Sequence, residues 1–163
     1  MKRNLGGCCI LLLLAAWVGA RAAVPTDEQV RQLVDEVCTS LASDVQTTFN
    51  KVDENPKIYR PDPKANLVIY EMNGTIAASP IPGAVRKNLV KKPDARGKLY
   101  RQEMVDMAAK IGTGTIEYAD RDPRTPEGPI EDRVLYFKVA KGKDGKSYIV
   151  AFIKPKPAGV KVP

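Results

Sequence analysis

Apolar residues recur at helical spacing through the first part of the chain after residue 25. They lie one to four positions apart and form a single stripe: Val30, Leu33, Val34, Val37, Cys38, Leu41, Ala42, Val45, Phe49 and Val52. This period places them on one face of a helix. Thr26 and the two acids after it suit a helix start, and Asn55-Pro56 is a stop signal. We therefore predict one continuous helix from residue 26 to about residue 52, too long for a domain of this size to cover completely.

The pattern changes to β-rich runs after a proline-rich connector at residues 56–63. Two such runs, residues 66–72 and 75–79, flank Asn73-Gly74, which predicts a β-hairpin because a type I′ turn needs positive φ at both central positions. A loop rich in proline and glycine follows, up to residue 97. The remaining elements are one helix and three strands, expected at residues 99–111, 114–119, 133–140 and 147–154.

The order of these elements indicates an α+β fold. Five short strands with mostly hairpin-compatible links favour one antiparallel sheet, with the helices on one side of it. The long N-terminal helix would pack on this sheet, and one further helix would lie between strands 2 and 3. We place the domain at residues 23–154 and treat residues 155–163 as an extended proline-rich tail.

Residues 1–22 have the pattern of a secretory signal peptide. A basic start precedes an apolar run of fourteen residues, and Ala20 and Ala22 supply the small side chains that signal peptidase requires. We expect cleavage after Ala22, with Ala23 as a near alternative, and export to the periplasm. The alternative is an uncleaved inner-membrane anchor, although the run is short for a helix that needs about 20 residues to span hydrocarbon.

Composition excludes several kinds of chemistry. The 163 residues contain no histidine, which excludes Ser-His-Asp and Cys-His nucleophiles, imidazole zinc sites and CxxCH haem attachment. No glycine motif for phosphate binding is present either, so we expect no enzyme activity, no metal and no cofactor. Loss of Lys2, Arg3 and Arg21 with the signal would lower the net charge from +7 to +4. The remaining cations are scattered among acids, so we expect no nucleic-acid partner.

Six short segments follow one another with gaps that are typical of one family. They are LVIYEMNGT at residues 67–75, Ala78-Ser79-Pro80, Lys87-Asn88-Leu89, the helix through residues 103–105, GTIEY at 114–118 and LYFK at 135–138. Together they resemble the single Cache domain, the PAS-like extracytoplasmic sensor module of bacterial chemoreceptors and histidine kinases. The resemblance covers residues 27–154.

The resemblance implies a long N-terminal helix on a five-stranded antiparallel sheet. It places a ligand pocket between the concave face of the sheet and the loop and short helix that follow the first hairpin. Ligands of the family are small organic anions such as short carboxylates, or amino acids and similar metabolites. Three places depart from the family pattern. Ser79 stands where histidine is common, Arg86 where glycine usually precedes Lys-Asn-Leu, and Ser147-Tyr148-Ile149 replaces an aromatic segment with tryptophan near the final strand. The ligand specificity of the family therefore cannot be carried over.

Seven polar side chains inside the matching segments are candidate ligand-binding residues. They are Tyr70, Ser79, Arg86, Lys87, Tyr118, Tyr136 and Lys138. An anion would need a cation and a few hydroxyl or N–H donors within a mostly apolar pocket. A core or edge position is an equally good interpretation for the tyrosines, and a solvated loop charge for the two basic loop residues. Strand alternation puts Tyr136 and Lys138 on one face of the sheet. This pairing makes Lys138 a better candidate for ligand binding than a lysine that is simply exposed.

The predicted signal peptide and the family resemblance together imply an exported, free-standing sensor domain that binds a small organic anion or metabolite. It would act through a separate membrane partner, a histidine kinase or a chemoreceptor. The uncovered turns of the long helix would be available for pairing with a second copy, as a homodimer. The alternative is a structural or interaction subunit of an extracytoplasmic complex with a vestigial pocket, for example beside a c-type cytochrome, to which Cache modules are sometimes attached.

Overall fold

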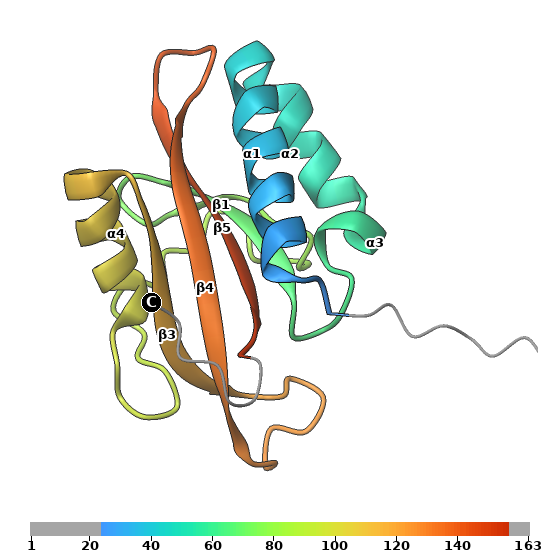
Figure 1. Cartoon of the computed structure of the whole chain (residues 1–163), viewed down its shortest axis with the longest axis vertical. Coiled ribbons are helices and arrows are strands. Elements are labelled where there is room, and N and C mark those ends of the chain that lie inside the picture. Colours follow the sequence, from blue (N-terminus) through green and yellow to red (C-terminus); the bar gives the residue numbers. More distant parts are fainter. Residues whose placement is uncertain (1–23, 157–163) are drawn as a thin grey trace, which may run out of the picture.

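The computed structural model describes residues 24–156, so the predicted signal peptide and most of the predicted tail lie outside the described residues. Five strands form one antiparallel sheet in the order β2-β1-β5-β4-β3 (Figure 1). The strands are β1 (Asn66–Glu71), β2 (Ile76–Ala78), β3 (Thr113–Arg121), β4 (Ile130–Lys141) and β5 (Ser147–Pro155). The helices are α1 (Asp27–Ser43), α2 (Val45–Glu54), α3 (Pro56–Tyr59) and α4 (Tyr100–Ile111). This confirms the predicted α+β class and the helix between strands 2 and 3.

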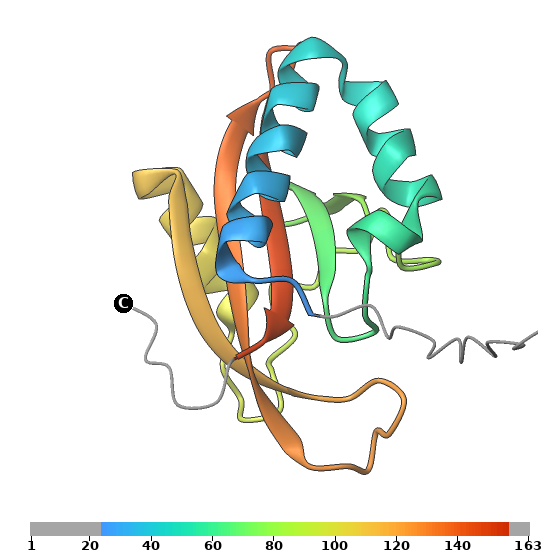
Figure 2. The same cartoon turned by 45° about the vertical axis from the view of Figure 1, so that its right-hand side comes forward.

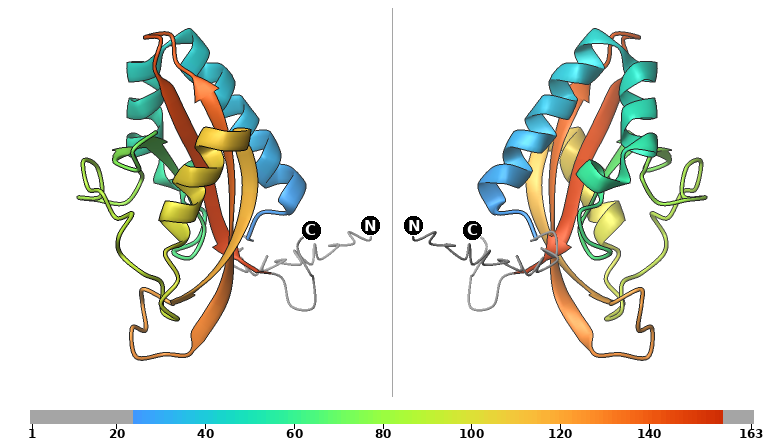
Figure 3. Two further views of the ribbon diagram at one scale, coloured as in Figure 1. Left: turned by 90° about the vertical axis from the view of Figure 1, so that its left-hand side faces the viewer. Right: turned by 90° about the vertical axis from the view of Figure 1, so that its right-hand side faces the viewer.

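Helices cover both faces of the sheet. The central strands β1 and β5 are buried at nearly every position, so both of their faces need a cover. One face packs on α1 and α2, through side chains that include Leu67, Ile69 and Phe152. The other face packs on α4, through Val68, Tyr70 and their neighbours (Figure 3). The expectation of helices on one side only was therefore wrong, because the apolar runs of the central strands were too continuous for a half-exposed sheet.

The N-terminal helical region is broken at Asp44. The backbone of this residue is extended (φ −158°, ψ 113°), and its Oδ1 accepts a hydrogen bond from the Thr47 backbone N–H at 2.8 Å. The chain reverses there, so that α1 and α2 run side by side in opposite directions (Figure 2). The predicted helical content is confirmed, but the predicted continuity was wrong: Asp44 ends α1 and caps α2, because its carboxylate satisfies a free N–H group at the start of α2.

This break changes the expectation about the apolar stripe. Val30, Val34, Val37 and Leu41 of α1 are all buried against the sheet, and α2 folds back to bury Val52 beside them. The predicted excess of uncovered turns is therefore not present in α1 and α2. These helices therefore do not offer the apolar surface on which the expected pairing with a second copy was based.

The first hairpin and the end of α4 form at the predicted places. Gly74 has φ +83° in the turn between β1 and β2, and Gly112 has φ +72° where α4 ends. The predicted type I′ turn was wrong, because Asn73 does not have the positive φ that this turn requires at both central positions. The connector after α2 contains the single helical turn α3, which the sequence pattern did not reveal. No helix among residues 24–156 is long and apolar enough to cross a membrane.

We predict that Asp44→Ala lowers the melting temperature by roughly 2–6 °C, because the first turn of α2 loses its side-chain cap. Asp44→Asn keeps a carbonyl oxygen in the same place and should stay near the wild type. Thermal unfolding followed by circular dichroism measures both. An equal drop in melting temperature in the two variants would show that the Asp44 side-chain cap does not stabilise the break between α1 and α2.

Candidate functional site

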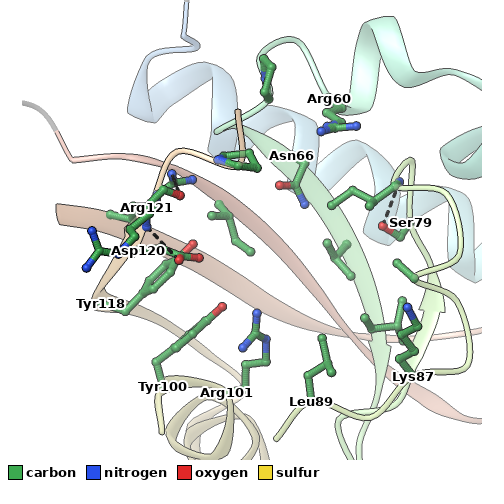
Figure 4. Close-up of a pocket in the computed structure, with 18 of the residues that line it drawn as sticks. Arg60, Asn66, Ser79, Lys87, Leu89, Tyr100, Arg101, Tyr118, Asp120 and Arg121 are labelled. Atoms are coloured by element: carbon green, nitrogen blue, oxygen red, sulfur yellow. Dashed lines mark hydrogen bonds between the residues drawn. The ribbon is translucent and has the colours of Figure 1, made fainter. Parts of the chain in front are cut away.

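A cavity of about 540 Å³ lies on the α4 side of the sheet. It is enclosed by β1 and β5, by α4, by the loop that follows β2, and by residues 120–126 at the end of the β3–β4 hairpin (Figure 4). The volume lies in the range of pockets that hold small organic ligands. The cavity occupies the place where the cover of the sheet changes from a helix to a loop.

Three buried tyrosines line this cavity. Tyr70 lies on β1, and the rings of Tyr100 and Tyr118 are stacked with centroids 3.9 Å apart and planes 11° from parallel. Burial raises the pKa of Tyr70 and Tyr118, and raises that of Tyr100 well above its ordinary value of 10. All three hydroxyls are therefore protonated at neutral pH and can donate hydrogen bonds.

Positive charge dominates the lining. Five cationic side chains reach the cavity against two carboxylates: Arg60, Lys87, Arg101, Arg121 and Arg133, with Asp120 and Asp122. Asp122 is already occupied, with ion pairs to Arg124 at 2.7 Å and Lys64 at 3.2 Å. The hydrogen bond from the Arg124 side chain holds the pKa of Asp122 far below its usual range. The net field of the lining favours an anion.

Three of the lining arginines have an unused donor. Five buried side-chain nitrogen or oxygen atoms in residues 24–156 lack a hydrogen-bond partner, and three of them are the Nε atoms of Arg60, Arg101 and Arg133. Arg133 is 4% exposed. Its other two guanidinium nitrogens donate hydrogen bonds to the backbone carbonyls of Arg121 and Lys64, at 2.8 and 3.4 Å. A buried, unpaired donor on a charged group costs more than about 1–3 kcal/mol. A ligand with acceptor oxygens would recover this cost.

Four of the seven predicted residues line the cavity. They are Tyr70, Ser79, Lys87 and Tyr118. Ser79, where the resembling family often has histidine, is held at the start of the loop: its backbone N–H donates to Asp53 at 2.7 Å, and its Oγ accepts from the Ile81 N–H at 3.2 Å. Lys87 has no hydrogen bond or ion pair through its ammonium group within residues 24–156. Contact with a ligand stays a prediction for all four.

The structure does not bring the other three into the cavity. Tyr136 and Lys138 lie on the α1 face of the sheet, where Lys138 pairs with Asp35 at 2.7 Å and Tyr136 packs in the core beneath α1. Alternation correctly placed them on one face, but it does not tell which face carries the cavity. Arg86 is exposed in the loop and has φ +71°. We leave these three out of the proposed site.

Sequence reasoning missed Arg60, Tyr100, Arg101 and Arg133. Arg133 had a usable signal, because it alternates with apolar Leu135 and Phe137 on the cavity face of β4. An arginine in such a row is either paired or functional. Arg60 lies in an irregular connector and Arg101 is one of several helix cations, so only the folded chain shows that both line the cavity.

The fold is similar to that of three solved structures of chemotaxis proteins and chemosensory domains. A structure described as the periplasmic sensor domain of a chemotaxis protein has a TM-score of 0.58 at 17% identity, over 80% of this chain and 94% of that one. A methyl-accepting chemotaxis protein from Vibrio parahaemolyticus has a TM-score of 0.54 at 15% identity, over 78% and 86%. A Cache chemosensory domain described for carboxylic acid recognition has a TM-score of 0.51 at 13% identity, over 82% and 100%.

No family model and no curated protein matches the sequence. At these low identities the structural likeness concerns the fold, and it confirms the Cache fold that the resemblance predicted. The four lining residues named from the motifs occupy the part of that fold where the resemblance placed a pocket.

Arg86 is the one non-glycine residue with positive φ in residues 24–156, at the position where the resembling family usually has glycine. We predict that Arg86→Gly raises the free energy of unfolding by up to about 1 kcal/mol, because it removes the left-handed strain of a side chain. Arg86→Val should lower it, since a branched side chain tolerates this backbone poorly. Urea unfolding measures both, and a stability loss in Arg86→Gly would contradict the reasoning.

The buried tyrosines predict a loss of stability in alkali. A tyrosine whose pKa is higher in the folded chain has no effect below pH 10 and destabilises above it, because the unfolded chain loses the proton first. Tyr100→Phe should therefore weaken the decline above pH 10 by about 1.4 kcal/mol per pH unit. Urea unfolding at pH 8 and pH 11 gives the difference. Parallel declines in wild type and variant would contradict the burial of this hydroxyl.

Proposed function

We propose that this chain is an extracytoplasmic sensor domain whose cavity binds a small organic anion, in the first place a carboxylate. The bound state would be reported to a membrane signalling protein, a chemoreceptor or a histidine kinase. The observation that carries the proposal is the set of three buried arginine Nε atoms without partners, all belonging to residues that line one cavity.

The chemistry of the lining suits a carboxylate. A carboxylate accepts two parallel hydrogen bonds from a guanidinium, and such charge-assisted bonds are stronger than neutral ones. Arg101 lies beside Tyr70, and its guanidinium stacks over the ring of Tyr100 with the Cζ atom 4.3 Å from the centroid. Stacking fixes the plane of the guanidinium while its edge stays available. The neutral tyrosine hydroxyls can add donors to the same oxygens.

The structural likeness supports the setting of this activity. One similar structure is described as periplasmic and another as recognising carboxylic acids. The predicted signal peptide would deliver the domain to the same compartment. A sensor of this kind binds without catalysis, and residues 24–156 contain no cluster of metal-ligating side chains.

A vestigial pocket fits the lining less well. A cavity that no longer binds a ligand has no reason to keep several arginines half-buried, because each unpaired donor lowers the stability of the fold. Apolar substitutions would fill the space and remove the cost. The presence of five cations around a cavity of about 540 Å³ favours a working site.

The proposal predicts that small carboxylates raise the melting temperature and that matched neutral amides, such as propionamide against propionate, do not. At 100 times its Kd a ligand stabilises by about 2.7 kcal/mol. Arg101→Gln should weaken carboxylate binding roughly 10- to 100-fold, the value of a charge-assisted hydrogen bond. Thermal shift and titration calorimetry measure these effects.

Lys138→Gln is the matched control, because it removes the same charge from the opposite face of the sheet. It should leave carboxylate binding unchanged. Equal binding of the neutral amides, equal losses in both variants, or no response to any carboxylate would each contradict the proposed function.

A further inference from the structure

Arg60 and Arg101 reach the cavity from opposite sides. Arg60 follows α3, where the chain turns toward β1, and Arg101 lies in the first turn of α4 (Figure 4). Each has a buried Nε without a hydrogen-bond partner, and neither guanidinium forms an ion pair within the described part of the chain. A single carboxylate bound to one of them would leave the other unpaired.

The rest of the lining between these cations is largely apolar. The sheet contributes Val68 and Ile153, and the stacked rings of Tyr100 and Tyr118 form a further wall. Such a surface suits the hydrocarbon part of a ligand, whose burial contributes about 0.8 kcal/mol per CH₂ group. The cavity therefore offers two arginines on opposite sides with apolar side chains of the sheet between them, in addition to the other charged lining residues.

The net positive charge of the lining is also larger than one anionic group would neutralise. Asp122 is neutralised by Lys64 and Arg124, and Arg133 is partly balanced by Glu131 at 3.8 Å. The remaining lining cations still outnumber the one free carboxylate, that of Asp120. A monoanion would leave an excess of positive charge inside the cavity, whereas a dianion would balance it more closely.

We infer that the ligand is a linear dianion, a dicarboxylate whose two ends pair with Arg60 and Arg101 across an apolar segment. This inference rests on the proposed function, since it names the class of anion for the same site. It assigns the specificity of the site to two residues that come from separate elements of the fold.

Titration calorimetry of the purified protein tests it with linear dicarboxylates of increasing length and with their monomethyl esters, which keep the length and remove one charge. At least one diacid should bind about tenfold more tightly than its own ester. Arg60→Gln and Arg101→Gln should each lower the affinity for the diacid to about that for the ester, and Lys138→Gln should not. The comparison of diacid with ester needs no variant, so it decides the question even where a variant fails to fold.

Two outcomes would overturn the inference while the proposed function stands: equal binding of diacid and ester, or tighter binding of glutamate than of glutarate. Tighter binding of glutamate would mean that the ammonium group of the ligand pairs with Asp120. The cavity would then recognise one carboxylate and one amine. No binding of any diacid, ester or other carboxylate would overturn both.

Discussion

Burial of the central strands on both faces is the constraint on which the rest of this structure depends. The apolar runs of β1 and β5 leave neither face for solvent, so the chain has to supply two covers. The first is a helical pair, and its reversal at Asp44 fits two helices onto the length of the sheet. The second is made by α4 together with a loop and the end of a hairpin. A loop packs less closely than a helix face, and the cavity lies where this second cover is irregular.

The position of the cavity explains its chemistry. The sheet lines it with core side chains such as Val68, Tyr70 and Ile153, because these continue the core. Its cations come from several elements: Arg121 and Arg133 from the sheet, Arg101 from α4, and Arg60 and Lys87 from the connectors. Desolvation keeps the tyrosines neutral, and the same desolvation makes the unpaired guanidinium nitrogens unfavourable in the empty state. Stability and binding are thus linked: a carboxylate would contribute the acceptors that the fold itself does not provide.

The sequence predicted the features that depend on neighbouring residues, and it did not predict those that depend on contacts between distant elements. The period of 3.6, the Asn73-Gly74 turn and the αL glycine after α4 each depend on neighbours in the chain, and each predicted its element. The break at Asp44 was missed because the apolar stripe continues across it, and only the capping geometry reveals the reversal. Alternation grouped Tyr136 with Lys138 correctly but could not choose between the two faces of β4. Arg60 and Arg101 line one cavity through the packing of distant elements, which no local pattern records.

The central claim is that the unpaired arginine nitrogens of this cavity receive a carboxylate. The most direct measurement is the ¹H–¹⁵N spectrum of the arginine Nε–H groups during titration with a linear dicarboxylate. The Nε–H signals of Arg60 and Arg101 should shift and saturate together at the calorimetric Kd, while the signal of Arg31, an exposed residue of α1, should stay in place. Unchanged Arg60 and Arg101 signals at a carboxylate concentration that saturates the protein would contradict the account.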